Sequence, residues 1–138
     1  MGFVSNKLTE FLADDLEPGE VIVASCVDVH ASGGMTKIAL TNGTVTRNDA
    51  SPIPHGAILV VTDRRLLVVA TKVGGRRPER VATELRISEL RAERGVKKMM
   101  LIKVPTLAIT AHGAEPVVFE APKARSKDLA AVATALGC

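Results

Sequence analysis

Two short apolar runs near the middle of the chain, Ala57–Val61 and Leu66–Ala70, flank the polar cluster Thr62–Arg65. Short β-branched runs bounded by turn residues predict strands, and this pair predicts an antiparallel hairpin. The turn contains neither Asn-Gly nor Asp-Gly, so a four-residue loop around a type I turn is expected rather than a two-residue loop. Because neither run alternates with polar residues, we expect both faces of the hairpin to be covered, with Val60 and Leu67 buried.

The residues before this hairpin predict a helix, a strand and an inserted segment. Helical spacing of apolar residues over 5–16 predicts a short helix within residues 1–18, which Glu17-Pro18-Gly19 ends. A strand is expected over Glu20–His30, and strict alternation would place four valines on one of its faces: Val21, Val23, Val27 and Val29. Residues 31–56 are rich in Gly, Ser, Thr and Asn, and they predict an inserted loop or hairpin.

The second half of the chain predicts further short strands and a closing helix. Residues 97–105 (KKMMLIKVP) do not alternate, so we expect them to form a long link rather than a strand. Pro105 separates this link from the strand that follows. The expected elements are strands at 80–87, 90–96, 106–111 and 116–120 and an amphipathic helix within 125–137, with Ser126 as its N-cap and Gly137 as its terminator.

Length and composition agree with one folded domain spanning 1–138. The 138 residues are 46% hydrophobic and 24% charged, which is an ordinary globular balance. No apolar run approaches the roughly 20 residues of a membrane-spanning helix, and the N-terminus lacks the layout of a signal peptide. A soluble, cytoplasmic protein is therefore expected. Cys26 and Cys138 do not suggest a disulfide framework.

Seven or so hairpin-connected strands with a closing helix predict a mainly β fold, a small antiparallel barrel or sandwich. Three segments resemble the bacterial pleckstrin-homology-like (PH-like) and GRAM-like domains: Leu16–Val21 (LEPGEV), Gly56–Leu67 (GAILVVTDRRLL) and Ile87–Leu90 (ISEL). The resemblance implies a bent antiparallel barrel of about seven strands, with a C-terminal capping helix and, here, a short N-terminal helix. It implies no enzyme and supplies no catalytic residues.

The sequence offers little for catalysis, metal binding or nucleic-acid binding. His30, His55 and His112 fall on a strand end, a loop and a turn, and no spacing typical of a metal site joins them. Cys26 lies among valines, where burial would raise its pKa. The chain has no Trp or Tyr, so base-stacking platforms are absent. We expect no catalytic residues, no cofactor, no metal and no nucleic-acid partner.

Charge is distributed unevenly along the chain. Residues 72–103 hold ten of the 18 basic residues and four of the 15 acidic ones, a local balance of 10 − 4 = +6. In a meander, successive turns fall at alternating ends, so the turn after 71 and the link 97–105 should share one end. The candidate binding residues are those of these two segments: Arg76, Arg77, Lys97, Lys98, Met99, Met100, Leu101, Ile102 and Lys103.

A cationic rim around apolar residues allows three interpretations. Residues 97–103 could be core or a self-association surface, they could bind a partner protein, or they could contact an anionic membrane. The leading hypothesis is a non-catalytic binding or scaffolding module that acts through protein–protein contacts and forms a homo-oligomer. The alternative is a peripheral adaptor that binds anionic membrane lipids through this end.

Overall fold

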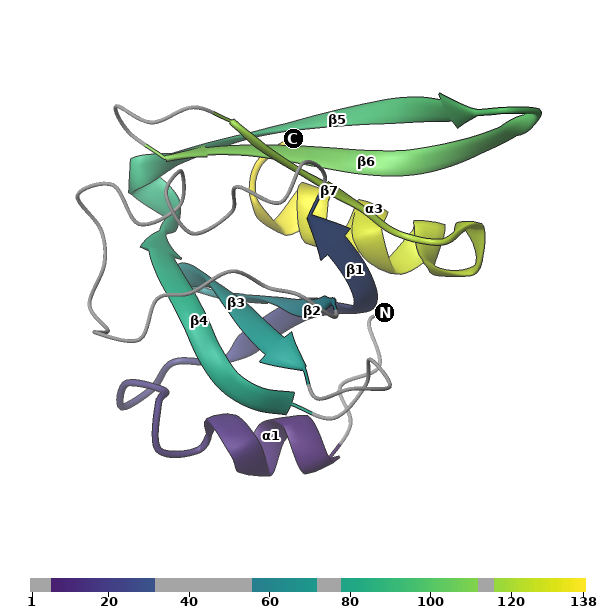
Figure 1. Ribbon diagram of the computed structural model, residues 1–138. Coiled ribbons are helices and arrows are strands. Elements are labelled where there is room, and N and C mark those ends of the chain that lie inside the picture. The colour runs from purple at the N-terminus through teal and green to yellow at the C-terminus, as the bar shows by residue number, and fades with distance from the viewer. Residues whose placement is uncertain (1–5, 32–55, 72–77, 112–115) are drawn as a thin grey trace.

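The computed structural model describes residues 6–31, 56–71, 78–111 and 116–138 of the chain. Several predicted features lie outside these ranges. They are the insertion at 31–56 except for its two end residues, the turn with Arg76 and Arg77, and the histidines His55 and His112. The elements, shown in Figure 1, are α1 (Asn6–Leu12), β1 (Ile22–Ala31), β2 (Ala57–Thr62), β3 (Arg65–Thr71), β4 (Pro78–Arg86), η1 (Ile87–Glu89), β5 (Leu90–Met99), β6 (Ile102–Ala111), β7 (Val117–Glu120), η2 (Lys123–Arg125) and α3 (Ser126–Ala135).

The fold is mainly β, as expected. Seven strands form one antiparallel sheet in the order β4-β3-β2-β1-β7-β6-β5. The sheet bends along β1, which pairs with β2 over most of its length and then with β7 through His30 and Ala31. Asp28 marks the bend, because the ladder with β2 is shifted there and the residue has a left-handed φ of 59°. The sheet is not closed, since β4 and β5 stand at its two ends.

The two faces of the β2–β3 hairpin belong to two different cores. Leu59 and Leu66 face the main core, which the bent sheet forms together with α3. Val60 and Leu67 face a second core, in which Leu8 and Leu12 of α1 pack against the outside of the sheet. Figure 1 shows α1 and α3 on these separate sides. Every residue of β2 and β3 is buried, which confirms the prediction drawn from their lack of alternation.

The turn between β2 and β3 is tighter than expected. β2 continues to Thr62 and β3 begins at Arg65, so only Asp63 and Arg64 lie between the strands. The hydroxyl Oγ1 of Thr62 accepts hydrogen bonds from the amides of Arg64 and Arg65, at 3.1 and 3.0 Å. This side chain supplies the acceptor that lets the strands continue without Asn-Gly, so the expected four-residue loop is wrong.

The four valines predicted to share one face do not do so, and Val21 lies just before β1. The register with β2 shifts between Ile22 and Ala24 and again between Cys26 and Val29. Each shift adds a residue to β1 and reverses which side chains point inward. Val29 therefore lies in the main core and Val27 against the second core, while Val21 and Val23 are exposed.

The helix ends differ from expectation in two places. α1 ends at Leu12 instead of Leu16, and the next residues form turns in which the Asp15 and Leu16 amides both bond to Leu12 O. The N-cap of α3 is Arg125, and its side chain makes no capping hydrogen bond. Ser126 is the first residue of the helix, so the prediction that it is the N-cap is wrong. Gly137 does terminate α3, with a φ of +93°.

Residues 97–105 are not a link. They complete a long hairpin in which β5 and β6 pair continuously from Leu90 with Ala111 to Met99 with Ile102. β7 pairs with β6 only between Thr106 and Ile109, so the hairpin continues past β7 as two strands. We call residues 96–105 the arm; Figure 1 shows it extending beyond the rest of the sheet. Strands without a buried face need no alternation, which is why the pattern did not predict them.

Candidate functional site

The arm exposes more large apolar surface than the other described parts of the chain. The exposed fractions are 93% for Met100 and 97% for Leu101, the two residues of its turn. Val96 and Ile102 follow with 67% and 60%. Single exposed apolar residues are normal, but four within one short hairpin make an apolar tip that the fold does not bury.

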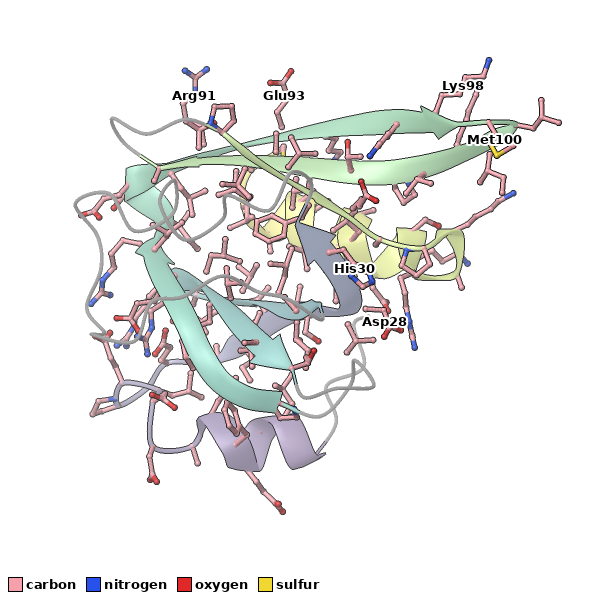
Figure 2. The ribbon with its side chains drawn as sticks, in the orientation of Figure 1. Asp28, His30, Arg91, Glu93, Lys98 and Met100 are labelled. Atoms are coloured by element: carbon pink, nitrogen blue, oxygen red, sulfur yellow. The ribbon has the colours of Figure 1, made fainter. Side chains whose placement is uncertain are left out.

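The turn at the tip is also unfavourable for its residues. Met100 has a φ of 56°, in the left-handed region that glycine and asparagine adopt more readily. A side chain there costs roughly 1–2 kcal/mol relative to the right-handed region. Asn-Gly would suit such a tight turn better. The chain instead has Met100 and Leu101 there, both almost fully exposed, and Figure 2 shows Met100 at the end of the hairpin.

The charges of the arm are all positive. Lys97, Lys98 and Lys103 lie between Gly95 and Thr106, and that stretch contains no Asp or Glu. Lys97 forms an ion pair with Glu120 of β7, with Nζ and Oε2 3.2 Å apart. Lys98 and Lys103 are direct cross-strand partners, and neither forms an ion pair with a residue that the structure describes. Like charges opposite each other weaken a hairpin, so these two lysines do not stabilise the arm.

The arm brings most of the predicted binding residues together. Lys97, Lys98, Met100, Leu101, Ile102 and Lys103 all lie on it, and the main chain of Met99 pairs with Ile102. Met100 and Leu101 are not core residues, because both are almost fully exposed. Arg76 and Arg77 lie outside the described residues, so their grouping with the arm stays a prediction.

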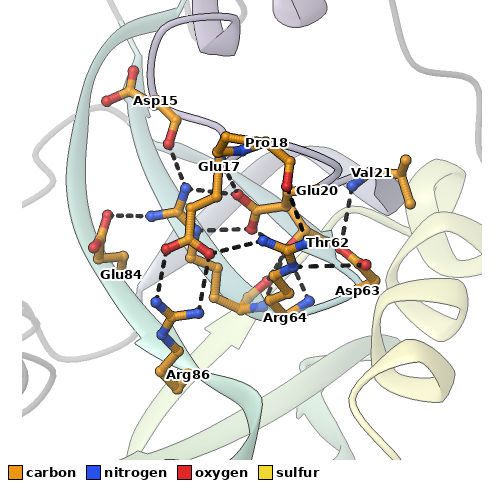
Figure 3. Close-up of polar contacts among 11 residues, drawn as sticks. Asp15, Glu17, Pro18, Glu20, Val21, Thr62, Asp63, Arg64, Glu84 and Arg86 are labelled. Carbon is orange, nitrogen blue, oxygen red and sulfur yellow. Dashed lines mark hydrogen bonds and ion pairs between the residues drawn. The ribbon is translucent and has the colours of Figure 1, made fainter.

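A second polar assembly, which sequence reasoning missed, surrounds the β2–β3 turn (Figure 3). Arg65 is only 5% exposed, and its guanidinium donates to both oxygens of buried Glu20: Nε to Oε2 at 2.9 Å and Nη2 to Oε1 at 2.8 Å. Its Nη1 donates to Glu84 Oε2 at 2.9 Å, and Nη2 also donates to the carbonyl oxygen of Asp15. Thr62 Oγ1 donates to Glu20 Oε2. We call Glu20, Thr62, Arg65 and Glu84 the buried cluster.

Hydrogen bonding sets the charge state of Glu20. Burial by itself would raise the pKa of this carboxyl, but the hydrogen bonds from Arg65 and Thr62 outweigh burial and lower the pKa to about 2. Glu20 is therefore ionised at neutral pH and bound on several sides. A carboxylate this fully partnered connects the segment after α1 to the turn and has no free lone pair directed at a substrate.

An exposed layer of ion pairs lies over the buried cluster. Glu17 accepts from Arg86 Nη2 at 2.8 Å and from Arg64 Nη1 at 3.2 Å, and Figure 3 shows it between the two arginines. Hydrogen bonds from Arg86 and then Arg64 lower the pKa of Glu17. Exposed pairs such as these contribute little to stability, because water screens the charges.

Other reactive side chains give no comparable site. Cys26 is buried, and its burial raises the thiol pKa to about 12, so little thiolate exists at neutral pH. Among the residues that the structure describes, no group of three His, Cys, Asp or Glu side chains is placed to hold a metal ion. A hollow of about 390 Å³ on β5 and β6 is lined by Arg91, Ala92, Glu93, Ala108 and Thr110. The main chains of these residues pair between β5 and β6 as part of the sheet. The arm is the stronger candidate.

Comparisons with known proteins assign no family. A scan against models of known protein families and a search of curated proteins both find no match to this chain. Within the described ranges, no helix is long and apolar enough to cross a membrane.

Proposed function

We propose that this protein is a non-catalytic binding module that acts through protein–protein contacts of its arm and self-associates. The observation that carries the proposal is the apolar tip, where Met100 and Leu101 are 93% and 97% exposed in a left-handed turn. Folding gains nothing from this arrangement, since the side chains bury no surface and the backbone is strained. Burial against a partner would recover the hydrophobic free energy of both side chains.

A protein partner suits the composition of the tip. Methionine adapts to irregular surfaces, and Leu101 and Ile102 provide the apolar centre that a protein interface needs. Two-stranded arms also expose main-chain groups, which a partner strand can satisfy. The proposal therefore places the binding energy in the apolar residues of the arm and a smaller share in its lysines.

We further propose that the scaffold is a PH-like domain. The bend at β1 and the helix α3 against the main core support this assignment. The segments that carry the sequence resemblance also meet in the structure, since Glu20 of LEPGEV is bound by Arg65 of the VTDRRL turn. The resemblance thus corresponds to a physical contact between two distant segments.

A second candidate, binding to anionic membranes, is favoured by one observation. The arm carries three lysines and no acidic residue, and Lys98 lies directly opposite Lys103 without a partner among the described residues. An anionic surface would relieve this repulsion, with about 1 kcal/mol for each lysine near the headgroups, while the apolar tip enters the interface.

Four single substitutions separate the two candidates. Met100→Asp and Leu101→Asp remove apolar contact, whereas Lys98→Ala and Lys103→Ala remove charge, and all four positions are exposed. Val23→Asp, at an exposed valine outside the arm, is the matched control. For a protein-binding module, sedimentation equilibrium should show that the aspartate variants weaken self-association at least about tenfold, while the lysine variants and the control change it little.

Vesicle binding tests the second candidate with the same proteins. Co-sedimentation with vesicles of phosphatidylcholine and phosphatidylserine should then depend on Lys98 and Lys103 and should fall steeply with added salt. If all four arm variants match the wild type both in self-association and in vesicle binding, the proposed function is wrong.

A further inference from the structure

One edge of the sheet, as far as the structure describes the chain, is the long strand β5, which has a neighbour on one side only. β5 is last in the strand order, it has ten residues, and β6 pairs with it along its whole length on one side. No strand in the described ranges pairs with its other side, and Figure 1 shows no labelled element beyond it. An uncovered edge of this length presents a row of unpaired amides and carbonyls that can pair with another strand.

We infer that the partner at this edge is a second copy of the chain, whose β5 pairs antiparallel to the first with Gly95 on the two-fold axis. In this register, each residue of 91–99 lies opposite the partner residue that is the same number of positions from Gly95 on its other side. Glu93 then lies opposite the partner's Lys97, which also pairs with Glu120 of its own chain, and by symmetry the same attraction acts twice. Both residues lie on the same face of β5, because they are separated by an even number of positions. This is the outer face of the sheet, since Arg94 between them points the other way and donates to Thr134 Oγ1 of α3 at 2.6 Å.

The charges of β5 select this register over its neighbours. A two-fold axis at Arg94 would place Arg94 against the partner's Arg94 and Arg91 against the partner's Lys97. An axis at Glu93 would place Glu93 against the partner's Glu93, and one at Val96 would place Arg94 against the partner's Lys98. Like charges directly opposite each other are destabilising. Among the registers that align the outer faces and pair most of β5, the Gly95 register alone has opposite charges facing and no like charges facing.

The same register also covers part of the exposed apolar tip. Continued by one residue, it brings Met100 beside the partner's Leu90, which is half-buried at the margin of the main core. Arg94 lies opposite the partner's exposed Val96, whose apolar surface the stem of the arginine can cover. One antiparallel contact therefore pairs the open edge of β5 and also covers two of the four exposed apolar residues of the arm, Val96 and Met100.

Gly95 suits a position on the two-fold axis because it carries no charge. The residue on a two-fold axis faces its own copy, so a charged side chain there would meet a like charge, and Gly95 carries none. Within one chain, Gly95 is required by its partner on β6, because a Cβ at this position would lie 2.8 Å from Thr106 Oγ1. The glycine satisfies both contacts.

This inference rests on the proposed function, because it specifies how the protein associates with itself. The test is a charge exchange across the two-fold axis, read as the dissociation constant of the dimer by sedimentation equilibrium. Glu93→Lys and Lys97→Glu should each weaken the dimer about tenfold or more, since each creates two like-charge contacts. The double variant restores opposite charges in exchanged positions and should return the constant to within about threefold of the wild type.

Matched controls keep the test specific. Glu10→Lys, at an exposed position on α1, changes net charge by the same amount as Glu93→Lys and should leave the dimer unchanged. A monomeric wild type, or a double variant as weak as the single ones, would overturn the register. If Met100→Asp and Leu101→Asp weaken association while the three charge variants do not, the arm binds through its tip alone; the edge contact is then wrong and the proposed function stands.

Discussion

The two long hairpins of this protein have opposite relations to the fold. β2 and β3 are buried along their whole length, and their polar turn is held by the buried cluster. The arm of β5 and β6 is exposed, and its turn is apolar. Both are antiparallel ladders, so secondary structure alone does not distinguish them. The difference lies in which side chains are exposed to water: the first hairpin buries even Arg65 of β3, whereas the second exposes Met100 and Leu101.

This comparison separates residues that the fold needs from residues that it does not. In the β2–β3 hairpin, each side chain has a partner that explains its identity: apolar residues face one of two cores, and Arg65 faces Glu20. In the arm, folding explains neither the apolar turn nor the facing lysines. Such residues are best explained by contacts outside the molecule, which is the basis of the proposed function.

The largest expected effect comes from breaking the buried cluster. Arg65→Ala leaves Glu20 and Glu84 without their cation, and removing one partner of a buried ion pair typically costs about 3–5 kcal/mol of unfolding free energy. Denaturant unfolding measures the loss. Arg86→Ala, which breaks an exposed pair with Glu17, is the control and should lose much less stability, because water screens exposed charges. Equal, small losses in the two variants would show that the cluster is not a structural lock.

A somewhat smaller effect is expected from the apolar residues of the two hairpins. Leu67→Ala should cost about 2–5 kcal/mol, because it leaves a cavity in the second core between β3 and α1. Leu101→Ala is the same substitution in the arm and should change stability by less than about 0.5 kcal/mol. The same denaturation experiment compares them. A loss below about 1 kcal/mol for Leu67→Ala would remove the β2–β3 hairpin from its central role.

Acid should weaken the fold through Glu20. The pKa of this carboxyl is lowered from 4.5 to about 2 in the folded protein, so the stabilisation is fully present above about pH 4.5 and is lost as the pH falls toward 2. Glu20→Gln should be less stable at neutral pH and should lack this part of the pH dependence. Unfolding free energies measured between pH 7 and pH 2 test this. Parallel curves for the wild type and the variant would contradict the assignment.

The sequence predicted the interior of the fold better than its edges and bends. Val60 and Leu67 were predictable because a run without alternation requires two covered faces. The faces of β1 were not, since two register shifts reverse its alternation and no residue type marks a bulge unambiguously. The arm was missed as a strand pair because neither of its faces is fully buried, so no period appears in KKMMLIKV.

The contact between Arg65 and Glu20 was missed for a different reason. The two residues are 45 positions apart, and no local pattern joins such distant residues. One signal did exist: an arginine beside a wholly apolar strand, at a position where both faces are covered, requires a buried acidic partner. The grouping of the arm's candidate residues at one place was predictable, because basic and apolar residues are contiguous in the sequence there; their role in binding stays a prediction.

β2 and β3 belong to the fold of one chain, whereas the inferred contact between two chains lies at the outer edge of β5. Hydrogen exchange of individual main-chain amides, followed at low and high protein concentration, tests it most directly. The amides of β2 and β3 should be strongly protected from exchange, to the same degree at both concentrations. Within 91–99, amides that do not pair with β6 should be unprotected when the protein is dilute and protected when it is concentrated. Exchange in β5 that is the same at both concentrations would contradict the inferred contact.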